Sequence, residues 1–480
     1  MHNYTSFFLD NPYVYYSLMG IYALTVIVIL MVVISENRNP VKSLAWITVL
    51  LLMPGVGIVL YMFFGRSIKN TRMISRRNRR RLKRVQQKHK VDPSRLGLSE
   101  QSRSLVKLAY SLSGAIYHVN NNVEIFTNGK DKFDALKKDI STARQYILIQ
   151  YYIFSDDKIG QEIAQLLIDQ ARKGVKVCVI YDHVGSLHTK NRFFKRMRKA
   201  GVKIYPFFKV TFPPFGTRIN WRNHRKICVI DGKVGYIGGM NIADRYVEGD
   251  KLGTWRDTHL RVTGTAVTSL LFSFAVDWNF MGQPLIDSEV VEIGKPVGDM
   301  GIQLMTSGPT SQWSNVAMMF HHAIVNSKKR VYLQTPYFLP TEGLLKALCA
   351  AALAKVDVRI MIPRRSDSRT MTYASCSYIT ECLRAGIKFY FYDGGMLHSK
   401  TLVIDDEFSS VGSTNFDFRS FEHNFESNLF IYSRELNSKM ADIFMQDLNQ
   451  STRVFPSEWK KRPRHVKIAE SLLRLLSPIL

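Results

Sequence analysis

One residue pattern occurs twice in this 480-residue sequence and limits the possible folds more than any other feature. In each copy a histidine and a lysine are separated by one residue, and an aspartate, a pair of small residues and an asparagine follow. The members are His224, Lys226, Asp231, Gly239 and Asn241 in the first copy, and His398, Lys400, Asp405, Ser413 and Asn415 in the second. Residues two apart on an extended strand point to the same side, so each histidine is expected beside its lysine. Two copies meeting about a pseudo-twofold axis would present two imidazoles and two ammonium groups to one phosphate.

The repetition extends beyond the motif. Segments 199–205 and 384–390 agree nearly residue for residue. Each half also has a strand-like run, a segment of helical spacing and a second buried strand, at 147–154, 160–172 and 175–182 in the first half and at 330–338, 344–354 and 356–363 in the second. This alternation predicts an α/β fold, and the repeat predicts two similar α/β domains at residues 116–290 and 296–455.

The first half has about eleven extra residues directly before its motif. They correspond to segment 209–219, which contains two phenylalanines around two prolines. An apolar loop at the mouth of a site can touch lipid or shape an entrance for an acyl chain. The alternative is an ordinary packed connector.

Residues 1–64 are predicted to form a transmembrane hairpin. Residues 14–34 and 44–64 are uncharged runs of 21 residues each. A helix of this length is about 32 Å long and matches the hydrocarbon core of a bilayer. The second run contains Pro54, Gly55 and Gly57, so it either spans with a kink or enters the membrane and returns without crossing.

The segments that flank the predicted domains are basic. Twelve Lys or Arg and no acidic residue lie between Arg66 and Lys90, within a predicted linker at 65–115. The positive-inside rule then predicts a multi-pass protein of the cell membrane with its domains on the cytoplasmic side. The block also suits anionic headgroups, although a solvated spacer is an equal alternative. The tail, 456–480, is basic and amphipathic, and is either an interfacial helix or a helix that caps the core.

The paired motif has the chemistry for displacement at a phosphodiester. Such a reaction needs a nucleophile, a proton for the leaving alcohol and positive charge at the non-bridging oxygens. Imidazole, with an ordinary pKa of about 6.5, can supply the first two, and the lysines and Asn side chains of the motif can bind the phosphoryl oxygens, near the small residues Gly239 and Ser413. The motif aspartates, Asp231 and Asp405, are interpreted as fixing local turns. The sequence contains no metal-binding motif, so no metal and no cofactor are expected. His321 and His322 are interpreted as structural or pocket-lining.

The sequence resembles the phospholipase D superfamily, whose signature the two motifs match in full. The hydrophobic anchors, the Arg-rich link and segment 253–264 make it most similar to the bacterial cardiolipin synthases. This resemblance implies that His224 is the nucleophile and His398 the general acid and later base, with the reverse assignment open. It also implies that Asp257 and Glu426 orient the histidines, and that the protein resides in the bacterial inner membrane.

The resemblance implies transfer of a phosphatidyl group from one phosphatidylglycerol to another, giving cardiolipin and glycerol. Anionic phospholipid and membrane are then the partners, and an oligomer is possible. A phospholipase D hydrolase and a phosphatidyltransferase with another alcohol acceptor would use the same residues. The net charge of +27 also fits a nucleic-acid phosphodiesterase, but hydrophobic anchors are an odd addition to a nuclease, so no nucleic acid partner is expected. A non-enzymatic membrane scaffold would not need two intact motifs.

Overall fold

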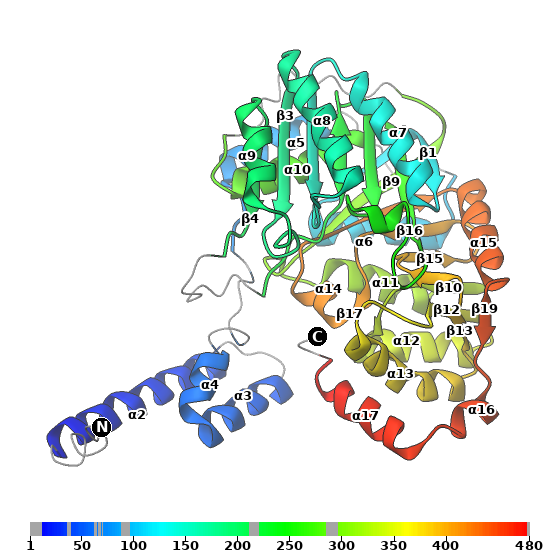
Figure 1. Ribbon diagram of the computed structural model, residues 1–480. Helices are drawn as coiled ribbons and strands as arrows, with labels where there is room; N and C mark the ends of the chain where they lie inside the picture. Colours follow the sequence, from blue (N-terminus) through cyan, green and yellow to red (C-terminus); the bar gives the residue numbers. More distant parts are fainter. Residues whose placement is uncertain are drawn as a thin grey trace. The chain divides into compact units, whose positions relative to one another are not determined.

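The computed structural model describes residues 12–35, 40–61, 65, 69, 71–87, 97–210, 220–284 and 296–477. The chain divides into two compact units (Figure 1). One comprises residues 1–67 with 211–220, and the other comprises 68–210 with 221–480. Most of the extra segment before the first motif, residues 211–219, lies outside the described residues, so its predicted lipid contact is not addressed by the structure.

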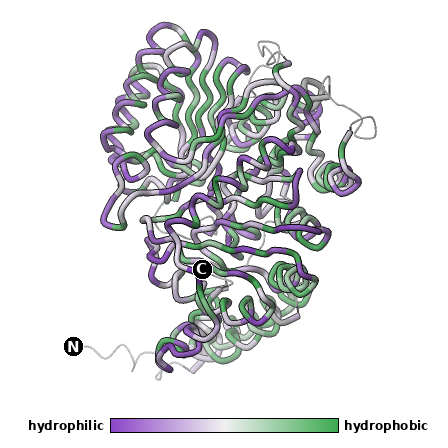
Figure 2. The backbone as a smooth tube through the Cα atoms, turned by 90° about the vertical axis from the view of Figure 1, so that its right-hand side faces the viewer, coloured by the Kyte–Doolittle hydropathy of each residue, from purple (hydrophilic) through white to green (hydrophobic). Residues whose placement is uncertain are grey.

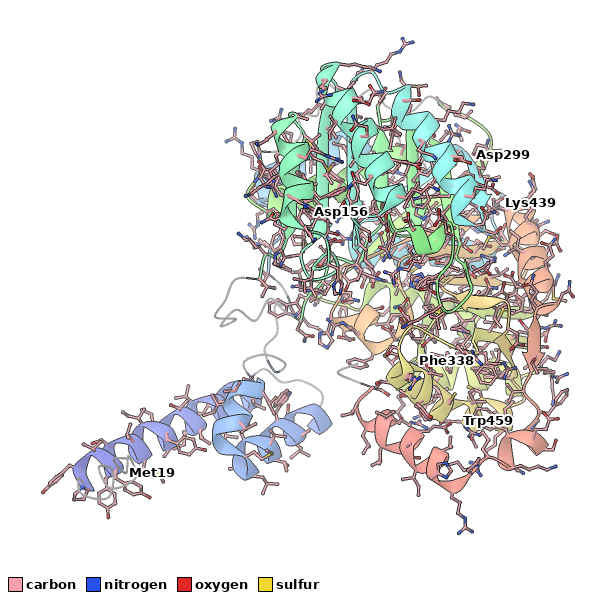
Figure 3. All side chains as sticks on the ribbon, in the orientation of Figure 1. Met19, Asp156, Asp299, Phe338, Lys439 and Trp459 are labelled. Carbon is pink, nitrogen blue, oxygen red and sulfur yellow. The ribbon has the colours of Figure 1, made fainter. Side chains whose placement is uncertain are left out.

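The first unit is helical. Its elements are α2 (Pro12–Ser35), α3 (Pro40–Leu52) and α4 (Pro54–Leu60). Val33 of α2, Leu50 of α3 and Tyr61 are its buried apolar residues. Other side chains of α2, such as Met19, are exposed (Figure 3), as expected for a helix whose surroundings are apolar.

The helix α2 contains a candidate membrane span. Residues Pro12–Met31 are long and apolar enough to cross a bilayer, with a mean hydropathy of 2.1. The second apolar run is interrupted at Met53, because Pro54 begins a new helix and cannot donate a backbone hydrogen bond to the helix before it. The resulting helices α3 and α4 have 13 and 7 residues, too few for either to span a bilayer alone. A second crossing stays a prediction.

The second unit contains both motif-bearing halves and the sheet that joins them. The elements of the first half are β1 (Tyr117–Phe126), α7 (Gly129–Ser141), β2 (Tyr146–Tyr151), α8 (Lys158–Arg172), β3 (Lys176–Asp182), α9 (Asn191–Lys199), β4 (Lys203–Phe207), β5 (Ile227–Ile230), β6 (Val234–Gly238), the 3-10 helix η4 (Asp244–Tyr246), β7 (Thr254–Arg256), β8 (His259–Gly264) and α10 (Val267–Phe280).

The second half repeats this order. Its elements are β9 (Met300–Ser307), α11 (Asn315–Val325), β10 (Arg330–Gln334), β11 (Phe338–Leu339), α12 (Glu342–Leu353), β12 (Asp357–Pro363), α13 (Arg369–Arg384), β13 (Lys388–Tyr392), β14 (Gly395–Leu397), β15 (Thr401–Ile404), β16 (Phe408–Gly412), β17 (Phe416–Asp417), α14 (Phe418–Glu422), β18 (Glu426–Tyr432) and α15 (Arg434–Leu448). The predicted strands and helices of the repeat are confirmed to within a few residues.

The described strands of the second unit form one 15-stranded sheet and two small two-stranded sheets. Strands β1 and β9 are adjacent and antiparallel. Outward from them the order is β8-β6-β5-β2-β3-β4 on one side and β18-β16-β15-β10-β12-β13 on the other, with β19 (Ser451–Arg453) beyond β13. Both halves thus place their motif strand, β5 or β15, beside an equivalent buried strand, β2 or β10.

Helices cover both faces of this sheet. Helices α7, α8 and α9 pack on one face of the first-half strands, and α11, α12 and α13 pack on the second-half strands. Helices α10 and α15 bury the side chains of alternate strand positions on the opposite face. In Figure 2 neighbouring strands are hydrophobic along much of their length, whereas the helices alternate between hydrophobic and hydrophilic residues. This agrees with strands buried on both faces and helices buried on one.

The segments predicted as linker and tail also carry helices. Helix α5 (Arg76–Gln87) contacts α10, and α6 (Glu100–Ser113) buries Leu105, Val106 and Ala109 in the core of the second half. In the tail, α16 (Pro456–Lys460) precedes α17 (Arg464–Leu475), which packs against α13. The outer face of α17 leaves three apolar side chains more than half exposed: Ile468, Leu472 and Leu475. Helix α17 therefore both covers the core and presents an apolar surface.

Candidate active site

The two motif segments are held by backbone pairing between the halves. The amide of His224 donates to the carbonyl of Phe425 over 2.9 Å, and the amide of Phe425 donates to the carbonyl of Arg222 over 2.8 Å. In the equivalent contact, the amide of His398 donates to the carbonyl of Arg256 over 2.7 Å. Each histidine is thus fixed to the residue just before the acidic residue of the other half, Glu426 or Asp257.

Each histidine contacts that acidic residue through its Nδ1 atom. Nδ1 of His224 lies 3.0 Å from Oε1 of Glu426, and Nδ1 of His398 lies 2.6 Å from Oδ2 of Asp257. Both carboxylates are fully buried. A carboxylate at Nδ1 favours the neutral imidazole tautomer that has its proton on Nδ1. The Nε2 atom then has a free lone pair. Sequence reasoning named both acids but not the exchange of partners between halves.

Both histidines line one pocket. Its volume is about 250 Å³, and Asn241, Asn415, Tyr152 and Trp255 also line it. The ring of Tyr152 lies 5.0 Å from that of His224, and the ring of Trp255 lies 5.3 Å from that of His398. A larger hollow of about 670 Å³ between β1 and α15 contains no motif residue. We assign the site to the smaller pocket because the histidine and the asparagine of both motifs line it.

The motif lysines are buried beside their histidines. The Nζ atom of Lys226 donates to the carbonyl of His224 over 2.6 Å, and Nζ of Lys400 donates to the carbonyl of His398. Nζ of Lys400 also lies 2.9 Å from Nδ1 of His398. The contact between Nδ1 and Asp257 is shorter, so we place the Nδ1 proton in a hydrogen bond to Asp257. Burial holds the pKa of Lys226 well below its ordinary value and lowers the pKa of Lys400 to about 8. An anionic phosphate in the pocket would favour the protonated form of both.

The remaining motif residues contact these groups from behind. A Cβ atom at Gly239 would lie 2.2 Å from Oδ1 of Asp257, so the absence of a side chain makes room for that carboxylate. At the equivalent position the hydroxyl of Ser413 donates to Glu426. The Oδ1 atom of Asn241 accepts from the amide of Ile153 over 3.1 Å. Gly239 and Ser413 therefore lie against the two carboxylates, and their expected position near the phosphate stays a prediction.

The motif aspartates bind backbone amides on a neighbouring loop. The carboxylate of Asp231 accepts from the amides of Arg144, Gln145 and Tyr146 over 2.8–2.9 Å. The carboxylate of Asp405 accepts from three amides in the same way, those of Lys328, Lys329 and Arg330. Both aspartates have left-handed backbone, with φ of 51° and 49°. Each one ties the turn after its motif strand to the start of the neighbouring strand, β2 or β10.

We expect Asp231→Ala to lower the free energy of unfolding by about 2–4 kcal/mol, because three amides lose a charged acceptor. Urea unfolding of the purified protein measures this. Asp406→Ala is the matched control, since Asp406 is exposed and its ion pair with Lys329 lies at the surface, where such pairs contribute up to about 1 kcal/mol. Equal stability of the two variants would contradict the structural role of Asp231.

The pKa directions predict a bell-shaped pH profile. Burial raises the pKa of Asp257 to about 6, so below that pH its carboxylate is protonated and no longer accepts from the His398 ring. Burial lowers the pKa of Lys400 to about 8, so its side chain loses its positive charge above that pH. We therefore expect kcat/KM to fall below about pH 6 and above about pH 8.

Initial rates between pH 4.5 and 9.5 would measure these two limbs, with Asp257→Asn expected to remove the acid limb. A flat profile over this range would contradict the assignment. Glu426 behaves differently: burial favours its neutral form, but His224, Lys226 and Ser413 outweigh this and lower its pKa. The acid limb is therefore assigned to Asp257.

Several buried residues around the site were missed by sequence reasoning. Arg225 forms an ion pair of 2.6 Å with Asp277 of α10, and Arg256 forms one of 2.9 Å with Asp447 of α15. Both helix carboxylates also accept from glutamines, Gln150 on β2 and Gln334 on β10. The glutamines occupy equivalent positions in the repeat, and this was the available signal.

His321 and His322 lie on α11 and do not line the pocket. Nε2 of His322 is 2.9 Å from the hydroxyl of Ser104 on α6, which agrees with a packing role. In the described ranges, no group of three or more His, Cys, Asp or Glu side chains is arranged to hold a metal ion.

Comparison with known proteins agrees with this fold. The family described as "Cardiolipin synthase, PLD-like domain" matches residues 136–251 and 320–448, and "Phospholipase_D-nuclease N-terminal" matches residues 21–66. The major cardiolipin synthase of Bacillus subtilis is 38% identical over 473 residues, which cover 96% of this chain and 98% of that protein. A cardiolipin synthase of Listeria monocytogenes is also 38% identical, over 96% of this chain and 100% of its own.

Among solved structures, phosphatidylserine synthase of Haemophilus influenzae shares the fold. The TM-score is 0.61 at 12% identity, over 78% of this chain and 100% of that one. The fold and the matched domains define an enzyme built from phospholipase D-like α/β domains. With relatives this similar over nearly its full length, the chain belongs to the cardiolipin synthase family. The resemblance predicted from the sequence is confirmed.

Proposed function

We propose that this protein joins two phosphatidylglycerol molecules into cardiolipin and glycerol through a covalent phosphohistidine. The observation that carries the proposal is one pocket lined by two histidines, each with a buried carboxylate at Nδ1. Such a pair supplies a nucleophile and a general acid on opposite sides of one phosphate. The names of the relatives support cardiolipin as the product.

In the first step, Nε2 of His224 attacks the phosphorus of a phosphatidylglycerol. A P–N bond forms, the P–O bond to the headgroup glycerol breaks, and His398, protonated on both ring nitrogens for this step, gives its Nε2 proton to the departing glycerol. Glu426 stabilises the positive charge that develops on the His224 ring. The assignment of His224 as nucleophile follows the family resemblance.

In the second step, His398 removes the proton from a glycerol hydroxyl of a second phosphatidylglycerol. This oxygen attacks the phosphorus, the P–N bond to His224 breaks, and cardiolipin leaves. Lys226, Lys400, Asn241 and Asn415 are proposed to bind the non-bridging oxygens, whose charge grows in both transition states. No step requires a metal ion.

The arrangement of the chain supports a membrane-bound enzyme. We infer that the two halves of the sheet are related by a pseudo-twofold axis between β1 and β9, which brings the motifs together. We also propose that α2 to α4 form a hairpin in the bacterial inner membrane, with a kinked or re-entrant second segment. The basic residues after it favour the cytoplasmic side, and the apolar face of α17 adds a second surface suited to lipid.

Product analysis tests the function. Purified protein is incubated in vesicles with labelled phosphatidylglycerol, and cardiolipin, phosphatidic acid and glycerol are separated. We expect cardiolipin and glycerol in equal amounts. Phosphatidic acid as the main product would overturn the proposal in favour of a phospholipase D hydrolase.

A further inference from the structure

Two arginines occupy equivalent positions at the pocket. Arg245 and Arg419 each follow the motif asparagine, Asn241 or Asn415, by four residues. Both line the pocket, and each lies in a short helix, η4 or α14. They belong to different halves, so the repeat supplies one guanidinium from each.

Arg245 belongs to the His398 side of the pocket. Its guanidinium carbon lies 4.8 Å from the centre of the Trp255 ring and 5.9 Å from that of Tyr246. These rings lie 5.3 Å and 5.7 Å from the His398 ring. Arg245 thus packs against the two aromatic side chains that contact His398, the proposed acid and base.

The guanidinium of Arg245 is available to a ligand. Within the part of the chain that the structure describes, it forms no ion pair with a carboxylate. Asp367 lines the same pocket, but it accepts a hydrogen bond from the hydroxyl of Tyr337. An arginine in a pocket without a carboxylate partner is well suited to bind a phosphate through two parallel hydrogen bonds.

The pocket also has unpaired groups suited to a polyol. The Oδ1 atoms of Asn415 and Asn424 are buried, and no described residue donates a hydrogen bond to them. Both residues line the pocket. Since buried acceptors are normally paired, hydroxyl groups of a bound glycerol moiety would be suitable donors.

The chemistry of the second step requires a further cation on the His398 side. The acceptor alcohol enters where glycerol left, next to the acid and base. A phosphatidylglycerol acceptor differs from glycerol in carrying its own phosphodiester, one glycerol unit away from the new P–O bond. Its negative charge is therefore expected one glycerol unit beyond the reacting phosphorus, on the side where His398 removes the proton, and a cation on that side would stabilise it.

We propose that Arg245 binds the phosphodiester of the acceptor lipid. The inference rests on the proposed function. The acceptor hydroxyl forms the new P–O bond, His398 takes its proton, and the P–N bond to His224 breaks, while Arg245 holds the unreacting phosphate. Arg245 is thereby the residue that favours a lipid acceptor over water and free glycerol.

Two rates measured in the same vesicles test this. One is cardiolipin formation from labelled phosphatidylglycerol, and the other is exchange of labelled free glycerol into phosphatidylglycerol, whose acceptor has no phosphate. For Arg245→Gln we expect cardiolipin formation to fall roughly 10- to 100-fold, the usual effect of losing a charged hydrogen bond, and glycerol exchange to stay within about threefold. Arg245→Lys should lie between the wild type and Arg245→Gln.

The controls separate the alternatives. Lys251→Ala, at an exposed position outside the pocket, should leave both rates unchanged. Equal loss of both rates in Arg245→Gln, or loss of neither, would overturn the proposal. A selective loss of cardiolipin formation in Arg419→Gln instead would place the acceptor on the His224 side and also overturn it. Failure of the proposed function is distinct, because the wild-type protein would then release phosphatidic acid and no cardiolipin.

Discussion

Replacing His224 or His398 with asparagine is expected to lower cardiolipin formation by at least about 10⁴-fold. Each imidazole acts in both half-reactions, and loss of one member of such a catalytic set typically removes most of the rate enhancement. Asparagine is chosen because its amide can still donate to Glu426 or Asp257, so neither buried carboxylate loses its partner. Rates are measured from labelled phosphatidylglycerol in vesicles.

A phosphatidyl ester of a good leaving alcohol, such as p-nitrophenol, separates the two roles. This alcohol departs without a general acid, so His398→Asn should still form the covalent intermediate but resolve it slowly. His224→Asn should form none. The amount of covalent intermediate is measured as acid-labile label bound to the protein. It is detected on a gel after the reaction has been quenched in alkali. Label only in His224→Asn would assign the nucleophile to His398, and near-normal cardiolipin from either variant would contradict the two-histidine mechanism.

The fold was largely predictable because its signals are local. The run between Lys226 and Asp231 is apolar throughout, which favours a buried strand, and β5 is buried at every residue. The alternation of strands and helices can likewise be seen in short segments of the sequence, and so can the repeat. The interruption of the second apolar run at Met53 was partly visible, since Pro54 was recognised as a source of a kink.

The connections across the site were less predictable because they depend on long-range pairing. Asp257 and Glu426 were named from the resemblance, but no spacing shows that each contacts the histidine of the other half. Two buried arginines illustrate this limit of prediction from sequence. Arg225 sits within one motif and Arg256 beside the acid of the other, yet each forms an ion pair with a helix carboxylate, Asp277 or Asp447. Only the folded sheet brings these positions together.

The second large effect is expected at the motif lysines. We expect Lys226→Met and Lys400→Met each to lower kcat by about 10²–10³-fold, as for removal of one donor from an oxyanion site. Both ammonium groups lie beside the histidines, at the carbonyls of His224 and His398, where little water screens their charge. Their attraction for the phosphoryl oxygens grows as negative charge develops, so kcat should change more than KM.

Methionine preserves the length of the side chain, and this makes the test specific to charge. Lys226 is fully buried, and burial holds its pKa well below the ordinary value. Its replacement by an apolar group removes the cost of burying this charge and should leave the stability similar or raised. The same change should raise the pKa of Asp257, which Lys226 helps to lower, and move the acid limb of the pH profile upward. Thermal unfolding in detergent and kcat measured across pH test both points. A fall in kcat that matched a fall in stability would show that Lys226 supports the fold, whereas an unchanged kcat at a normal unfolding temperature would remove the lysines from the proposed mechanism.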